Sequence, residues 1–193
     1  MVDEARIQAA LEVAYRQLGR RDRTVAELRW YLRRRELDPA GIEGALAVLI
    51  EQGYLDDARY AQRFAEDRRT LDGWGAERIA RRLEEAGVSP EHIADAVAAQ
   101  GSDDELMAAL TLLRRRLTGP PADDRSRERA LGLLVRRGYE LELAYDAVRA
   151  FERESREGVA RRHQVRGSRH IRHSGGEPLP RRNSWVTAKP WRS

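Results

Sequence analysis

The apolar residues of this chain follow the spacing of amphipathic helices. From Ile7 to Leu18 they recur every three or four residues, so they lie on one helical face. A second run of this kind begins after Thr24, a residue type favoured immediately before a helix. A third follows Asp38, which precedes a proline and gives the same start signal. The segment 4–53 is therefore predicted to contain three helices.

The three-helix pattern then recurs at an offset of 51 residues. The positions that match at this offset are Leu32, Leu83 and Leu134; Leu46, Val97 and Val148; and Gly87 and Gly138. Units of this size bury little surface alone, so neighbouring units are expected to pack end to end. The predicted fold is all-α, with three tandem three-helix, helix-turn-helix-like repeats in an elongated curved array. The predicted repeats span 1–55, 56–101 and 102–152.

The helical pattern fails from Arg153 to Ser193, where Gly, Pro, Ser, His and Arg replace the aliphatic residues. Such a composition buries too little apolar surface to offset the entropy of ordering, so 153–193 is predicted to be a disordered tail. The tail carries eleven basic and three acidic residues, a net of +8, against −4 for the first 152 residues. This asymmetry is typical of a nucleic-acid-binding arm. Its candidate contacts are Arg161, Arg162, Arg166, Arg169, Arg172, Arg181 and Arg182.

Composition also narrows the class of protein. The chain has no cysteine, and no apolar run approaches the roughly 20 residues that span a bilayer. The first residues lack the apolar core of a signal peptide, so a cytoplasmic protein without membrane contact is expected. There is no glycine-rich phosphate loop, metal-spaced cluster or nucleophile elbow, and His92 is the single histidine before the tail. We therefore expect a monomeric binding protein with no catalytic residues, no cofactor and no metal.

Arginines recur on the second helix of each repeat. The candidate partner-binding residues are Arg29, Arg33, Arg34, Arg78, Arg81 and Arg82. Each could belong to an ordinary solvated face, but their recurrence favours a basic stripe facing an acidic protein groove or a phosphate backbone. The third helices are poor in base-reading side chains, which favours scaffold turns over DNA-reading heads. Trp30 is expected in the core, while Trp74 either fills a gap between repeats or anchors a partner.

One segment resembles a known family. The run Gly53-Tyr54-Leu55-Asp56-Asp57, followed by Ala58-Arg59-Tyr60-Ala61, resembles the signature of RecX regulatory proteins. Flanking residues that fit the same family are Arg23, Thr24, Glu27 and Leu28 upstream, and Gly75, Arg78, Ile79, Leu83, Gly87 and Val88 downstream. Within the signature, Gly53 is expected to stop a helix, Tyr54 and Leu55 to pack a joint between repeats, and Asp56 or Asp57 to cap the next helix.

The resemblance implies three tandem repeats and a modulator, usually an inhibitor, of the RecA recombinase. Such proteins lie in the deep groove of the RecA–single-stranded-DNA filament and impede ATP hydrolysis, strand exchange and co-protease activity. The resemblance leaves open whether RecA is inhibited, activated or disassembled. Weak binding to single- or double-stranded DNA through the basic stripe and the tail is also expected. The alternative is a direct DNA-binding helix-turn-helix-type protein that acts without RecA.

Overall fold

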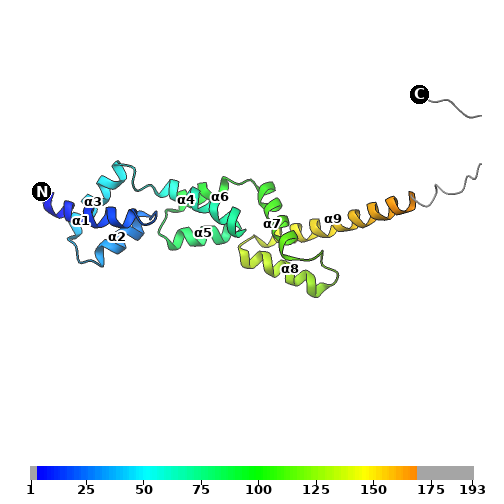
Figure 1. The fold of residues 1–193 in the computed structure, drawn as a ribbon. Helices are drawn as coiled ribbons and strands as arrows, with labels where there is room; N and C mark the ends of the chain where they lie inside the picture. Colours follow the sequence, from blue (N-terminus) through cyan, green and yellow to red (C-terminus); the bar gives the residue numbers. More distant parts are fainter. Residues whose placement is uncertain (1–3, 169–193) are drawn as a thin grey trace, which may run out of the picture. The chain divides into compact units, whose positions relative to one another are not determined.

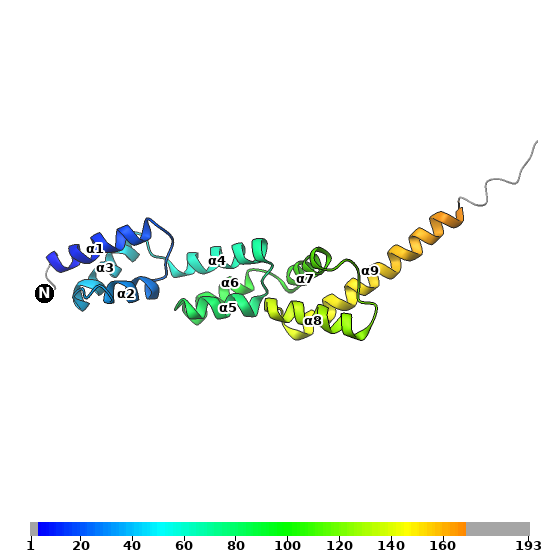
Figure 2. The same cartoon turned by 60° about the horizontal axis from the view of Figure 1, so that its bottom comes forward.

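A computed structural model describes residues 4–168, with side chains described as far as Glu154. Within this range the regular elements are all helical, as the apolar spacing predicts (Figure 1). The first repeat contains α1 (Glu4–Leu18), α2 (Val25–Arg33) and α3 (Pro39–Glu51). The second contains α4 (Asp57–Asp67), the π-helical turn η1 (Arg68–Asp72), α5 (Ala76–Glu85) and α6 (Pro90–Ala98). The third contains α7 (Ser102–Arg116), α8 (Asp124–Arg137) and α9 (Leu141–Ser168), and Figure 2 gives a second view of these groups.

The helices begin where the sequence carries capping residues. The Thr24 hydroxyl accepts a hydrogen bond from the Glu27 amide at 3.0 Å, and Asp38 accepts one from Gly41 at 2.8 Å. These bonds satisfy amides that have no partner within the first turn of the helix. The Glu27 side chain does not return a hydrogen bond to the Thr24 amide, because its carboxylate pairs with Arg21 at 3.1 Å.

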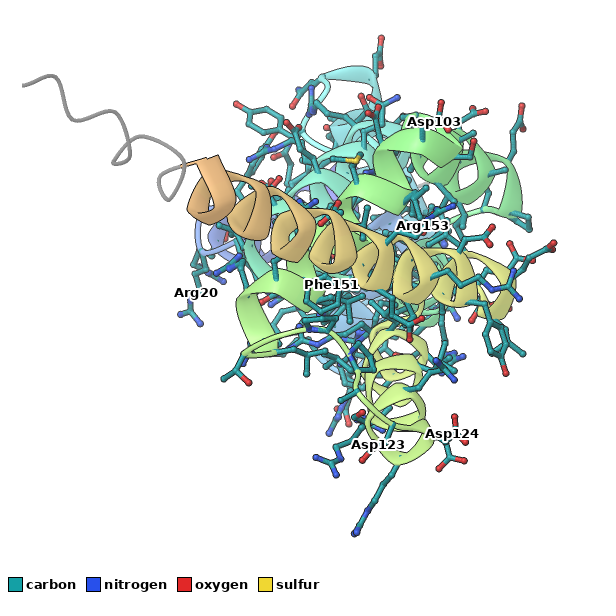
Figure 3. All side chains as sticks on the ribbon, turned by 90° about the vertical axis from the view of Figure 1, so that its right-hand side faces the viewer. Arg20, Asp103, Asp123, Asp124, Phe151 and Arg153 are labelled. Atoms are coloured by element: carbon teal, nitrogen blue, oxygen red, sulfur yellow. The ribbon has the colours of Figure 1, made fainter. Side chains whose placement is uncertain are left out.

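Each repeat has a core of its own, built from the positions that match at the 51-residue offset. Leu32, Leu83 and Leu134 are each fully buried. Burying one leucine in this way stabilises a fold by roughly 1.5–3 kcal/mol, so these positions anchor the second helix of each repeat. The third core includes Phe151 on α9, which is buried and is labelled in Figure 3.

The predicted tail begins inside a helix, because α9 continues past Arg153 to Ser168. The segment 153–168 contains no proline and is rich in Arg, Glu, Gln and Ala, which favour helix. Extending an existing helix avoids the cost of nucleation, so it requires no apolar face. Residues 169–193 lie outside the described range, so the prediction is untested there.

The expectation that Trp30 belongs to the core is wrong, since its side chain is 59% exposed. Its neighbours Leu28 and Leu32, two positions away on each side, are fully buried. Two helical residues span about 200°, so Trp30 lies on the opposite side of α2 from the core. Trp74 is half-buried and packs edge-on against Phe64, with 6.2 Å between the ring centroids.

Candidate functional site

The first joint between repeats brings the N-terminal end of α2 to the C-terminal end of α5. The Thr24 hydroxyl donates to the Ala86 carbonyl at 2.6 Å, while its oxygen also caps α2. The next amide, that of Val25, donates to the Asp57 carboxylate at 2.9 Å. Asp57 stands in the first turn of α4, so a side chain of repeat 2 satisfies the first amide of α2, while the end of α5 accepts the Thr24 hydroxyl.

The second joint has the same plan. The amide of Gly75 donates to the Arg137 carbonyl at 2.9 Å, and that of Glu77 donates to the Gly138 carbonyl at 3.0 Å. The amide of Ala76, at the start of α5, donates to the Glu105 carboxylate at 2.9 Å. Glu105 lies in the first turn of α7, the first helix of the following repeat.

The two joints correspond residue by residue at the 51-residue offset, because Val25 matches Ala76 and Gly87 matches Gly138. In both, the positive end of one helix dipole meets the negative end of another, and a carboxylate reinforces the contact. The carboxylates Asp57 and Glu105 are 48 residues apart, so the first helices are shifted in register. The sequence signals for this arrangement were the matched glycines and caps, but the carboxylates were not identified as partners.

Burial is the largest influence on Asp57, and it raises the pKa of that carboxyl group above its usual value. The hydrogen bond from the Val25 amide and the nearby imidazole of His92 oppose this shift. The buried environment wins because a carboxylate loses solvation that one amide bond does not replace. Keeping the Asp57 carboxylate charged at the joint between repeats 1 and 2 therefore costs free energy.

The signature segment is placed partly as predicted. Gly53 has a φ of 73°, which confirms the left-handed helix stop, and Asp56 caps α4 through the Arg59 amide at 2.9 Å. Leu55 is buried in the core of repeat 1. Tyr54 is 58% exposed and contacts Tyr15 of α1 edge-on rather than repeat 2.

The predicted arginines of α2 lie in different surroundings. Arg29 binds the Glu43 carboxylate through two nitrogens at 2.8 and 2.9 Å, and it is half-buried. Arg33 is exposed and lies 3.8 Å from the same carboxylate. Arg34 is exposed and its guanidinium stands 4.8 Å from the ring centroid of Trp30. Trp30, Arg33 and Arg34 thus form an exposed aromatic and basic surface, called here the α2 surface.

Of the candidate partner-binding arginines on α5, one belongs to the second joint between repeats. Arg78 donates to the Arg136 carbonyl at 2.9 Å and lies 4.3 Å from the Trp74 ring centroid. Arg82 forms an ion pair with Glu85, and both Arg81 and Arg82 are exposed. Arg161, Arg162 and Arg166 fall within α9 beyond the described side chains, while Arg169, Arg172, Arg181 and Arg182 lie outside the described residues.

The described part of the chain, residues 4–168, also bears on two other kinds of site, metal centres and membrane spans. Among these residues there is no group of three or more His, Cys, Asp or Glu side chains arranged to hold a metal ion. In the same range, no helix is long and apolar enough to cross a membrane.

These joints and cores define a class, that of tandem three-helix repeat proteins. Similarity to known proteins assigns the family. The family model of the first three-helix domain of RecX matches residues 10–49, and that of the second matches 56–97. The chain is 37% identical to the regulatory protein RecX of Thermobifida fusca, over 72% of this chain and 77% of that protein. It is 34% identical to that of Halorhodospira halophila, over 78% and 93%. The chain belongs to the RecX family of regulatory proteins.

The solved structures support the same fold. The crystal structure of RecX from Lactobacillus salivarius superposes with a TM-score of 0.69, covering 77% of this chain and 97% of that one. The two sequences are 16% identical over this region, so the likeness concerns the fold.

Proposed function

We propose that this protein binds the RecA–single-stranded-DNA filament in the bacterial cytoplasm and inhibits RecA ATP hydrolysis, strand exchange and co-protease activity. Membership of the RecX family of regulatory proteins carries the proposal. The tandem repeats supply the scaffold, and the exposed arginines supply groups that pair with carboxylates or phosphates. The protein acts by occupying a surface of the filament, without chemistry of its own.

The α2 surface is our candidate for the contact in repeat 1. Trp and Arg are the residue types most enriched where truncation weakens protein complexes. The guanidinium of Arg34 is already stacked on Trp30, so part of the entropy of ordering that side chain is lost before binding. Arg78 is better assigned to the joint, because it bonds the backbone of repeat 3.

The decisive experiment titrates the protein into RecA turning over ATP on single-stranded DNA. We expect inhibition at or below one molecule per RecA protomer. No change in ATP hydrolysis at a severalfold excess would overturn the proposed function. Salt-sensitive binding to naked DNA together with unaffected RecA would support the alternative, a DNA-binding protein that acts alone.

A charge-reversal variant then tests the α2 surface. The double variant Arg33→Glu, Arg34→Glu should keep its helicity by circular dichroism but raise the half-inhibiting concentration about tenfold. The matched control is Arg125→Glu, an exposed arginine in the first turn of α8. If both proteins inhibit like wild type, the contact lies elsewhere on the repeats.

A further inference from the structure

A groove of about 310 Å³ lies between the π-helical turn η1 of repeat 2 and helix α7 of repeat 3. Its lining includes Leu71 and Met107, which are 71% and 52% exposed although both side chains are large and apolar. Leu112, which is almost fully buried, also lines it. One exposed leucine is ordinary on a protein surface, but two such side chains lining one concave site are typical of a binding surface.

The rim of this groove is basic. Arg115 and Arg116 line one side, both are exposed, and neither has a hydrogen-bond or ion-pair partner among the residues described. The single carboxylate in the lining, that of Asp72, is already paired with Arg68 at 2.6 Å. The groove therefore presents uncompensated positive charge beside apolar side chains.

The turn that carries Leu71 is held in place from several directions. Arg68 spans it through Asp72, and its guanidinium lies 5.3 and 5.6 Å from the ring centroids of Phe64 and Trp74. Arg69 donates to the carbonyls of α6 at 2.8 and 3.1 Å. A surface ordered in advance loses little conformational entropy when a partner binds. Leu71 is thus presented on a fixed turn.

We propose that this groove binds a segment of the partner protein in which carboxylates flank an aliphatic or aromatic side chain. The apolar side chain would lie against Leu71 and Met107, and the carboxylates would pair with Arg115 and Arg116. Guanidinium groups bind carboxylates through two parallel hydrogen bonds, which orients the segment as well as holding it. The inference rests on the proposed function, in which that partner is RecA.

A protein segment fits this groove better than a nucleic acid. Its lining contains no aromatic side chain on which a base could stack, and its large apolar side chains are two leucines and a methionine. Phosphates would satisfy the two arginines but would leave Leu71 and Met107 without an apolar partner. The combination of charge and apolar surface therefore favours an acidic, partly apolar peptide segment.

The first test compares single variants of the full chain in the RecA ATPase assay. Leu71→Asp and Arg115→Glu should each raise the half-inhibiting concentration about tenfold or more, while circular dichroism stays unchanged because both side chains are exposed. The matched control is Leu141→Asp, since Leu141 is 56% exposed but lies outside the groove. Equal inhibition by wild type, Leu71→Asp and Arg115→Glu would overturn the inference and leave the proposed function intact.

The second test identifies what occupies the groove. The variant Met107→p-benzoylphenylalanine, irradiated with RecA filaments, should crosslink to a RecA peptide rich in Asp and Glu that also contains a large apolar residue. The same photoreactive group in place of Leu141 is the control. Crosslinking from position 107 to DNA, or to a RecA peptide without carboxylates, would contradict the inference. Wild-type protein that leaves RecA unaffected would overturn the proposed function and this inference together.

Discussion

Single residues in left-handed conformations decide how closely neighbouring repeats approach. Gly87 and Gly138 have φ values of 77° and 84°, and each lies against the second helix of the preceding repeat. A Cβ on Gly138 would lie 2.3 Å from the Cβ of Arg78. Glu36 is the matching position of repeat 1, with a φ of 57°, and its side chain is exposed. A side chain is thus tolerated at the matching position where it can reach solvent.

Two glycine variants separate the cost of conformation from the cost of contact. Gly53→Ala introduces a methyl group where no other atom lies within 4 Å, so it should destabilise the fold by only about 1 kcal/mol, the cost of a left-handed alanine. Gly138→Ala carries the same cost and also collides with Arg78, so a total loss of about 2–4 kcal/mol is expected. Urea denaturation of both variants measures the difference. Equal losses of unfolding free energy would mean that the second joint shifts to make room for the methyl group without further destabilisation.

At the scale of helices, the described elements show which parts of this fold a sequence can predict. The cores were predictable because Leu32 and its counterparts follow the helical period, and the starts because capping residues act locally. The bonds across the joints could not be predicted, since the one from Thr24 to Ala86 links residues far apart in the chain and the matched glycines do not show which groups meet. The exposed side of Trp30 could have been predicted from its spacing to Leu28, but its place in the middle of a helix suggested a buried residue.

The Asp57 carboxylate of α4 accepts the first amide of α2, so the stability of the first joint should depend on pH. Because the folded-state pKa of Asp57 is raised, the folded protein holds this proton more tightly than the unfolded chain does. The stability associated with Asp57 is therefore full below the usual carboxyl range and is lost as pH rises through the raised folded pKa. Asp57→Asn should keep the bond from Val25 through its amide oxygen and remove this loss.

Unfolding free energies of wild type and Asp57→Asn, measured from about pH 3.5 to 7, should converge at low pH. Toward pH 7 the variant should become the more stable protein, because it holds no charge in the half-buried joint. Asp57→Ala, the control, loses the cap and should be destabilised by about 1 kcal/mol at both ends of this range. Parallel curves for wild type and Asp57→Asn would show that Asp57 is not the group that titrates.

Across the whole molecule, the charge is distributed so that the repeats and the C-terminal segment differ in sign. The first 152 residues carry a net charge of −4, and the segment 169–193 alone carries six basic residues and one acidic residue. Association with the negatively charged DNA of a filament would be opposed by the first part and favoured by the second. The two family models, in contrast, match segments within residues 10–97. Recognition of RecA and attraction to DNA are therefore predicted to reside in different parts of the chain.

A chain that stops after Ser168 tests this division. Each phosphate neutralised on a single strand contributes about −0.7 to the slope of log affinity against log salt. If roughly four of the removed basic residues engage DNA, the full chain should show a slope steeper by about −2.8 than the shortened one. Fluorescence anisotropy with a labelled oligonucleotide over a range of NaCl concentrations measures both slopes.

A matched control keeps the full length but carries four substitutions, and it should behave like the shortened chain. They are Arg169→Gln, Arg172→Gln, Arg181→Gln and Arg182→Gln. Both proteins should still inhibit RecA, because the matched repeats are intact. Loss of that inhibition with helicity preserved would place recognition of RecA in the C-terminal segment.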